Sequence, residues 1–190
     1  MCTLKNALKQ SHDYIKSIVK NSDIVIDATA GNGNDTLMLA NLVGEGGKVY
    51  SFDIQDKAIN NTYKKLLNMG YENRVSIIKD GHQNMDTYVN EKGRIKAVMF
   101  NLGYLPGGDH SISTKADTTI EAITKAMELI MAGGLICIVV YYGKDTGVEE
   151  KDRIMQFVQK INFKEFIVME TSYINQVNCP PILICIEKQK

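Results

Sequence analysis

The sequence predicts an α/β protein built on a mostly parallel sheet with helices on both faces. Two observations predict this class. Short apolar runs alternate with amphipathic helical patterns along the chain, and several of the runs are apolar at nearly every position. Strands of that kind are covered on both faces, as in a doubly wound sheet. The length of 190 residues fits a single domain over residues 1–190.

Seven runs are short, apolar and bounded by polar or turn residues, so each predicts a strand. They are Asp23–Ala28, Lys48–Ile54, Arg74–Lys79, Ile95–Leu102, Gly134–Tyr142, Phe163–Thr171 and Ile182–Glu187. The last two are joined by a loop without a helical pattern, which favours antiparallel neighbours. Pro180 and Pro181 suit the entry to the final strand.

The segments between the strands carry helical patterns. In the first of them, Leu4, Leu8, Ile15, Ile18 and Val19 form one apolar stripe. The predicted helices are Leu4–Lys20, Asp35–Leu42, Gln55–Met69, Ser113–Met131 and Val148–Ile161.

Composition bears on three kinds of partner: nucleic acids, membranes and metal ions. Lys and Arg number 22, as do Asp and Glu, so the net charge gives no sign of a nucleic-acid partner. No apolar run approaches the roughly 18 residues of a membrane span, which predicts that the chain has no membrane partner. The four cysteines form no CxxC pair, so we expect no metal site and a reducing, cytoplasmic location; Cys137 and Cys185 are expected to be buried thiols.

A glycine loop, DATAGNGNDT, follows the first predicted strand and opens a helix. Gly31 and Gly33 allow a tight turn and a close approach to a ligand, although two glycines can also merely form a turn. The third glycine of a dinucleotide fingerprint is replaced by Thr36, and Asp27 would repel a pyrophosphate. An acid there suits a cation, which favours S-adenosylmethionine over NAD.

Carboxylates also end the next two strands. Asp53 could accept hydrogen bonds from both hydroxyls of a ribose. Asp80, Gly81 and His82 follow the third strand, where an adenine would lie, although Asp-Gly is also a common turn.

The most unusual segment, NLGYLPGGDH, spans Asn101–His110 after the fourth strand. The string NLGY resembles the N/D-P-P-Y arrangement of amino-group methyltransferases, with Leu-Gly in place of Pro-Pro. The resemblance implies that the Asn101 side chain accepts from a substrate amine and aims the nitrogen lone pair, and that Tyr104 stacks on the substrate. An alkyl amine must lose a proton at a cost of roughly 4–5 kcal/mol at pH 7. Asp109 and His110 are the candidate bases, and both could equally be exposed loop residues.

Seven strands with an antiparallel last strand resemble the Rossmann-like fold of class I methyltransferases. The strings DATAGNGNDT, FDIQ, DGHQNM, FNLGYLPGGD and YINQVNCPPILICIEK further resemble the bacterial YtqB family. Its members, long labelled rRNA methylases, are associated with S-adenosylmethionine-dependent methylation of 5-aminomethyl-(2-thio)uridine at the tRNA wobble position. Residues 141–147 depart from the histidine-containing string frequent there, so no role of those histidines transfers.

The resemblance implies a role for each matching residue. The methionine end of the cofactor would be framed by Asp27, Thr29, Gly31, Asn32, Gly33, Asp35 and Thr36, and Asn101 would adjoin it. Asp53 and Gln55 would hold the ribose, and Gly81 and His82 would flank the adenine. The segment from Asn101 through Tyr104 to Asp109 would face the uridine.

Alternatives stay open. The acceptor could be rRNA or a small amine, and a nucleotide-binding protein without catalysis or an NAD oxidoreductase is a further reading. If the anticodon loop of tRNA is the partner, the core's own loops or a second subunit of a homodimer must recognise it. Positive potential is then expected near residues 101–110. The favoured phosphate contacts are Lys115 and Lys144, which lie in or near loops at the strand carboxyl ends, whereas a solvated face is the preferred interpretation for most of Lys5, Lys9, Lys16, Lys20, Lys64 and Lys65.

Overall fold

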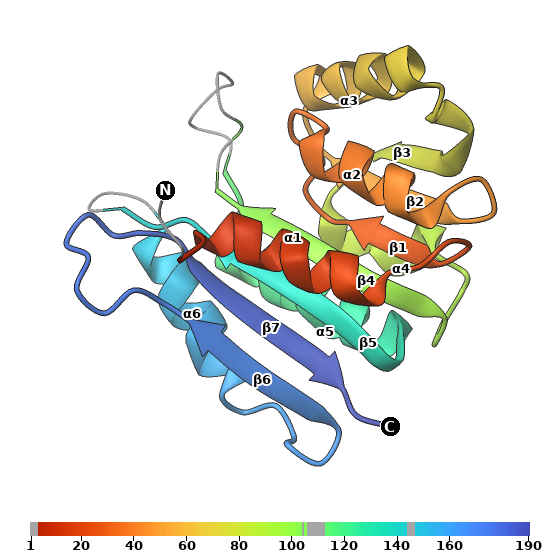
Figure 1. Cartoon of the computed structure of the whole chain (residues 1–190). Coiled ribbons are helices and arrows are strands. Elements are labelled where there is room, and N and C mark those ends of the chain that lie inside the picture. The colour runs from red at the N-terminus through yellow and green to blue at the C-terminus, as the bar shows by residue number, and fades with distance from the viewer. Residues whose placement is uncertain (1–3, 104, 106–112, 144–146) are drawn as a thin grey trace.

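The computed structural model describes residues 4–103, 105, 113–143 and 147–190. It contains one sheet of seven strands in the order β3-β2-β1-β4-β5-β7-β6 (Figure 1). The strands are β1 (Ile24–Asp27), β2 (Lys48–Asp53), β3 (Val75–Lys79), β4 (Ile95–Leu102), β5 (Ile130–Val140), β6 (Phe166–Thr171) and β7 (Ile182–Lys188).

The direction of the strands confirms the predicted topology. β1 runs parallel to β2 and β4, β2 to β3, and β4 to β5. β7 is antiparallel to both of its neighbours, β5 and β6. The class I methyltransferase arrangement expected from the sequence is therefore the observed one.

Helices cover both faces of the sheet, as predicted. α1, α2 and α3 lie on one face, and α4, α5 and α6 lie on the other (Figure 1). None of the helices among the described residues is long and apolar enough to cross a membrane. The helices are α1 (Ala7–Ile18), α2 (Asn34–Val43), α3 (Asp56–Met69), α4 (Met85–Tyr88), α5 (Ala116–Leu129) and α6 (Val148–Val158).

The pleat of the strands divides the core into two layers. Val25 packs with α1 and α2, whereas its neighbour Ile26 packs with α5 on the opposite face. Cys137 and Cys185 face each other across β5 and β7 with their sulfur atoms 3.9 Å apart, and both are buried. This confirms that they are buried thiols.

Element boundaries differ from the prediction where local hydrogen bonds decide them. α1 begins at Ala7 because the Asn6 side chain accepts from the Lys9 amide at 2.9 Å and caps the helix. β5 begins at Ile130, inside the segment predicted as helix, because Ile130 is extended and pairs with Ile95. The short helix α4 and the 3-10 helices Glu72–Arg74 and His82–Asn84 contain too few residues to show a helical period in the sequence.

Candidate active site at the carboxyl ends of β1, β2 and β4

Backbone hydrogen bonds to β4 and β2 hold the glycine loop in place. The amide of Ala28 donates to the carbonyl of Met99 on β4, and that of Ala30 donates to the carbonyl of Phe52 on β2, each at 2.8 Å. Gly31 then donates its amide to Asp53 Oδ2 at 2.9 Å. The loop therefore lies at the carboxyl edge of the sheet, where doubly wound folds bind their ligands.

Gly33 is required by both backbone conformation and packing. It precedes α2 with φ at +77°, and a Cβ added there would lie 2.7 Å from Cα of Thr62 on α3. Thr62 is fully buried, so its backbone cannot retreat. The glycine thus lets α2 and α3 approach while the loop turns.

We expect Gly33→Ala to lower the free energy of unfolding by roughly 2–4 kcal/mol, because the left-handed strain and the clash add together. Urea unfolding measures it. Gly70→Ala is the matched control, since Gly70 has φ at +69° with no atom within 4 Å of its added Cβ. It should cost about 1 kcal/mol. Equal losses in the two variants would show that the contact with Thr62 is not limiting.

Asp27 is a buried carboxylate at the end of β1. Its oxygens accept from the hydroxyl of Thr36 at 2.5 Å and the amide of Thr29 at 3.1 Å. Burial raises the pKa of Asp27 from 3.8 to about 7, and the nearby charge of Asp35 contributes in the same direction. At a pH near 7, therefore, Asp27 is close to the midpoint of its ionisation. A cation bound beside it would favour the ionised carboxylate.

Asp35, Asn101 and His12 form a second polar cluster from three elements. Asp35 lies in the first turn of α2 and is 6% exposed. Its Oδ1 lies 2.7 Å from Nε2 of His12 on α1, and its Oδ2 lies 3.4 Å from Nδ2 of Asn101 on β4. A carboxylate accepts only, so the amide nitrogen of Asn101 faces Asp35.

The other end of the Asn101 amide has no partner among the described residues. Oδ1 is buried and accepts no hydrogen bond there. The backbone of Asn101 is held, because its amide donates to Thr29 Oγ1 at 2.8 Å. Since a buried acceptor without a donor costs about 1–3 kcal/mol, its presence at a ligand-binding edge marks a position where a ligand N–H or O–H would bind.

The carboxylate after β2 is already engaged by the backbone. Asp53 Oδ1 accepts from the amide of Gln55 at 2.9 Å, while Oδ2 accepts from Gly31. Each oxygen keeps a further lone pair, so the predicted bonds to a ribose remain available. Asp53 therefore links the glycine loop to the start of α3.

Asp80 and His82, which follow β3, have different hydrogen-bond partners. His82 is buried, with Nδ1 3.2 Å from the carbonyl of Ala28 and its ring against Phe100. Burial lowers the pKa of His82, so the ring is neutral at pH 7. Asp80 accepts from Gly81, Asn84 and Tyr88 instead. His82 thus joins the residue after β1 to the β4 residue Phe100.

The glycine loop also borders a polar cavity. Asn32 Oδ1 accepts from Asn61 Nδ2 at 2.9 Å, which joins the loop to α3. The cavity measures about 410 Å³ and is lined by Asn32, Asn34, Asn61, Lys64 and Lys65. Lys64 and Lys65 therefore lie next to the loop.

The segment after β4 is fixed at its base. Two hydrogen bonds join Gly103 and Thr114. The Gly103 amide donates to Thr114 Oγ1 at 3.0 Å, and the Thr114 amide donates to the Gly103 carbonyl at 3.1 Å. Thr114 and Thr119 donate their hydroxyls to buried Glu150 of α6, at 2.8 and 2.7 Å. Leu105 is buried, and a Cβ on Gly31 would lie 3.6 Å from it.

Two residues of this region were not predicted. His12 comes from a helix that precedes the sheet in sequence, and no local pattern points to it. Tyr141 follows the apolar strand β5, so the rule that selected Asp53 and Asn101 could have found it. It is 42% exposed, and burial together with the charge of Asp35 raises its pKa. Tyr104, Asp109, His110 and Lys144 lie outside the described residues.

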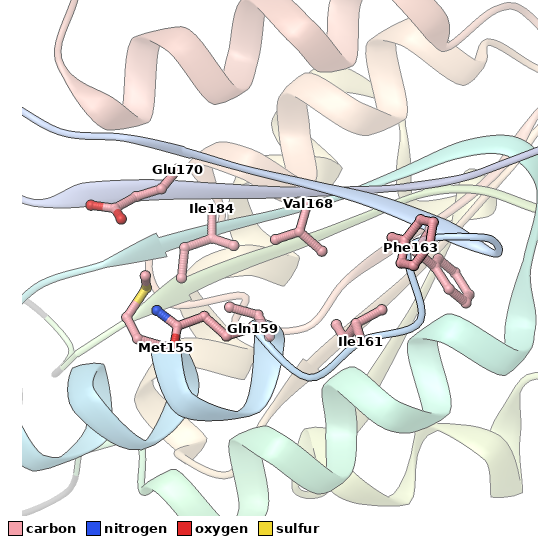
Figure 2. A pocket seen from close by; sticks show the side chains of 9 residues that line it. Met155, Gln159, Ile161, Phe163, Val168, Glu170 and Ile184 are labelled. Atoms are coloured by element: carbon pink, nitrogen blue, oxygen red, sulfur yellow. The ribbon is translucent and has the colours of Figure 1, made fainter.

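A separate apolar groove of about 380 Å³ lies between α6 and the strands β6 and β7 (Figure 2). Met155 lines it from α6, Gln159 from the turn directly after α6, and Val168 and Glu170 from β6. It contains none of the predicted site residues. Within the described ranges, no three His, Cys, Asp or Glu side chains are grouped to hold a metal ion.

Comparisons with known proteins agree on one family. Residues 49–187 match the family described as "Putative rRNA methylase". A chloroplastic tRNA (mnm(5)s(2)U34)-methyltransferase of Arabidopsis thaliana is 36% identical over 97% of this chain and 70% of its own length.

Solved structures of similar chains extend over almost the whole molecule. A putative rRNA methylase from Clostridium thermocellum is 62% identical with a TM-score of 0.96, covering 98% of this chain and 100% of its own. A putative methyltransferase from Streptococcus mutans, in complex with SAH, is 42% identical with a TM-score of 0.89, covering 98% and 99%.

Proposed function

This chain belongs to the Putative rRNA methylase family, and from that premise we propose that it methylates 5-aminomethyl-(2-thio)uridine at the wobble position of tRNA. The donor is S-adenosylmethionine and the product is the 5-methylaminomethyl form. The chloroplastic relative, whose name specifies mnm(5)s(2)U34 in tRNA, supports this substrate. The Streptococcus mutans structure with SAH supports the donor, because SAH remains after S-adenosylmethionine gives up its methyl group.

The observation that carries the proposal is Oδ1 of Asn101, a buried acceptor that has no donor among the described residues. A substrate amine would bring an N–H donor to this acceptor. A hydrogen bond from that N–H would direct the nitrogen lone pair away from Asn101 and toward the methyl carbon. The Asp35 carboxylate, by holding Nδ2, keeps Oδ1 directed at the substrate.

The residues at the strand ends fit the proposed donor. When bound, S-adenosylmethionine supplies an electrophilic methyl group on a positively charged sulfur. Asp27 and Asp35 provide the negative charge that its cationic methionine end requires. Asp53 and Gln55 would hold the ribose, and Gly81 and His82 would border the adenine.

The remaining assignments belong to the same proposal. Asp109 or His110 would take the amine proton, and Tyr104 would stack on the uridine. Lys64 and Lys65 at the polar cavity, with Lys115 exposed before α5, would contact phosphates. The methyltransferase unit would be one domain over residues 1–190, with tRNA bound by its own loops or by a homodimer. The buried free thiols support a cytoplasmic location.

The family description makes rRNA the second candidate acceptor. We expect the purified protein with S-adenosylmethionine to add one methyl group to 5-aminomethyl-2-thiouridine in tRNA that carries this nucleoside. Mass spectrometry of the digested nucleosides measures it. Ribosomes, a pool of small amines, and tRNA already carrying the methylaminomethyl group are the parallel samples. Methylation of ribosomes alone, or of the small amines alone, would overturn the tRNA assignment.

A further inference from the structure

His12 makes a contact that its own helix does not need. α1 is capped by Asn6 and anchored in the core by Ala7 and Ile15. The His12 side chain is 24% exposed and reaches across to α2, where its Nε2 lies 2.7 Å from Asp35 Oδ1. The contact therefore connects α1 to the polar cluster beside Asn101 rather than to the core.

The chemistry of the three side chains fixes the direction of every hydrogen bond. The Asp35 carboxylate can only accept, so His12 must carry hydrogen on Nε2 and Asn101 must present its NH2 group. Asp35 is thereby held from two sides. The His12 contact, at 2.7 Å, is the shorter of the two, and the Asn101 contact is 3.4 Å long.

Loss of the shorter contact would release the carboxylate. With only the long contact to Asn101 remaining, Asp35 could turn toward other donors, and the Asn101 amide could then rotate. Rotation by half a turn exchanges its nitrogen and oxygen, which would present a donor where the substrate amine needs an acceptor.

We propose that His12 is a positioning residue for methyl transfer: by donating Nε2–H to Asp35 it holds the carboxylate that orients the Asn101 amide. This inference rests on the proposed role of Asn101 in accepting a hydrogen bond from the substrate amine. His12 acts through Asp35, the one side chain that its Nε2 contacts among the described residues. His12 lies in α1, outside both the glycine loop and the segment after β4.

Kinetics of three variants test the inference. His12→Ala should lower kcat about 10- to 100-fold, because the Asn101 amide is then no longer held in one orientation. His12→Gln should recover most of kcat, because its amide nitrogen can occupy the place of Nε2. Ser17→Ala is the matched control, since the Ser17 hydroxyl on α1 bonds only locally to the Tyr14 carbonyl. It should retain wild-type kcat. The inference is wrong if His12→Ala keeps wild-type kcat, or if the Ala and Gln variants lose it equally.

The acceptor for these measurements is whichever of tRNA, ribosomes or small amines the wild type methylates. A wrong tRNA assignment therefore leaves the comparison of His12 variants intact.

A second measurement needs no turnover. The chain has three histidines, so the ring nitrogens can be resolved by nitrogen-15 NMR, with the His12 signal assigned by its loss in His12→Gln. We expect hydrogen on Nε2 and a shift of this signal in Asp35→Asn. A ring with hydrogen only on Nδ1, or a signal unmoved by Asp35→Asn, would overturn the inference even if the tRNA assignment holds.

Discussion

Asn101→Ala is expected to lower kcat by roughly 10²- to 10³-fold while the affinity for S-adenosylmethionine changes little. The substitution removes the one buried acceptor at the site that lacks a donor among the described residues. Without it, the amine nitrogen is no longer oriented toward the methyl carbon, and misorientation of reacting groups costs factors of this size. Steady-state methylation of tRNA measures kcat, and calorimetric titration with SAH measures cofactor binding.

The control for this prediction is Asn41→Ala. Asn41 is exposed on α2 and accepts from the Tyr71 hydroxyl at 2.9 Å, away from Asn101. The same truncation there should leave kcat unchanged. A protein that binds nucleotides without catalysis would show no turnover to lose. Wild-type turnover in Asn101→Ala would refute the role of Oδ1 and leave the fold unaffected.

Asp27→Asn is expected to make the protein more stable at pH 8 and to weaken its binding of S-adenosylmethionine. Burial raises the pKa of Asp27 from 3.8 to about 7, so the folded state holds this proton more tightly than the unfolded state. The resulting stabilisation is complete below pH 3.8 and is lost as pH rises through about 7. The loss amounts to about 4 kcal/mol above that window. Asn, which stays neutral, avoids it.

Urea unfolding of wild type and Asp27→Asn between pH 4 and pH 8 checks the sign. The two proteins should be of similar stability at pH 4, and the variant should gain progressively toward pH 8. An Asn amide can donate to Thr36 Oγ1, which then donates to Ser51 Oγ, so the local hydrogen bonds survive. The affinity of wild type for S-adenosylmethionine should rise through pH 7, and that of the variant should not. A variant less stable than wild type at pH 8 would contradict the prediction.

The sheet could be predicted from sequence because burial on both faces makes its strands apolar throughout. Val25 and Ile26 face opposite layers, yet both must be apolar, and the run is visible without knowing the fold. The start of β5 could not be predicted, since Ile130 continues an apolar helical pattern and only its pairing with Ile95 makes it a strand.

In the site, too, residues with a local sequence pattern could be predicted and those placed by tertiary packing could not. Asp27, Asp53 and Asn101 were predicted because each follows or ends a strand, and the carboxyl ends of parallel strands converge. His12 lies 23 residues before Asp35, and the contact between them depends on where α1 packs on the same face of the sheet as α2. Tertiary packing of this kind leaves no pattern in the sequence. The roles assigned to the cofactor-binding residues stay predictions.

The paired bonds between Gly103 and Thr114, together with Glu150, have an evolutionary consequence. The segment they bracket begins and ends at one fixed point, so its length can change beyond the buried Leu105 without moving the ends of β4 and α5. Closing a longer loop at such a point adds little entropic cost, because that cost grows only with the logarithm of length. If this segment faces the acceptor as we propose, relatives can change their acceptor by replacing residues here while the strand ends that would hold the donor stay the same.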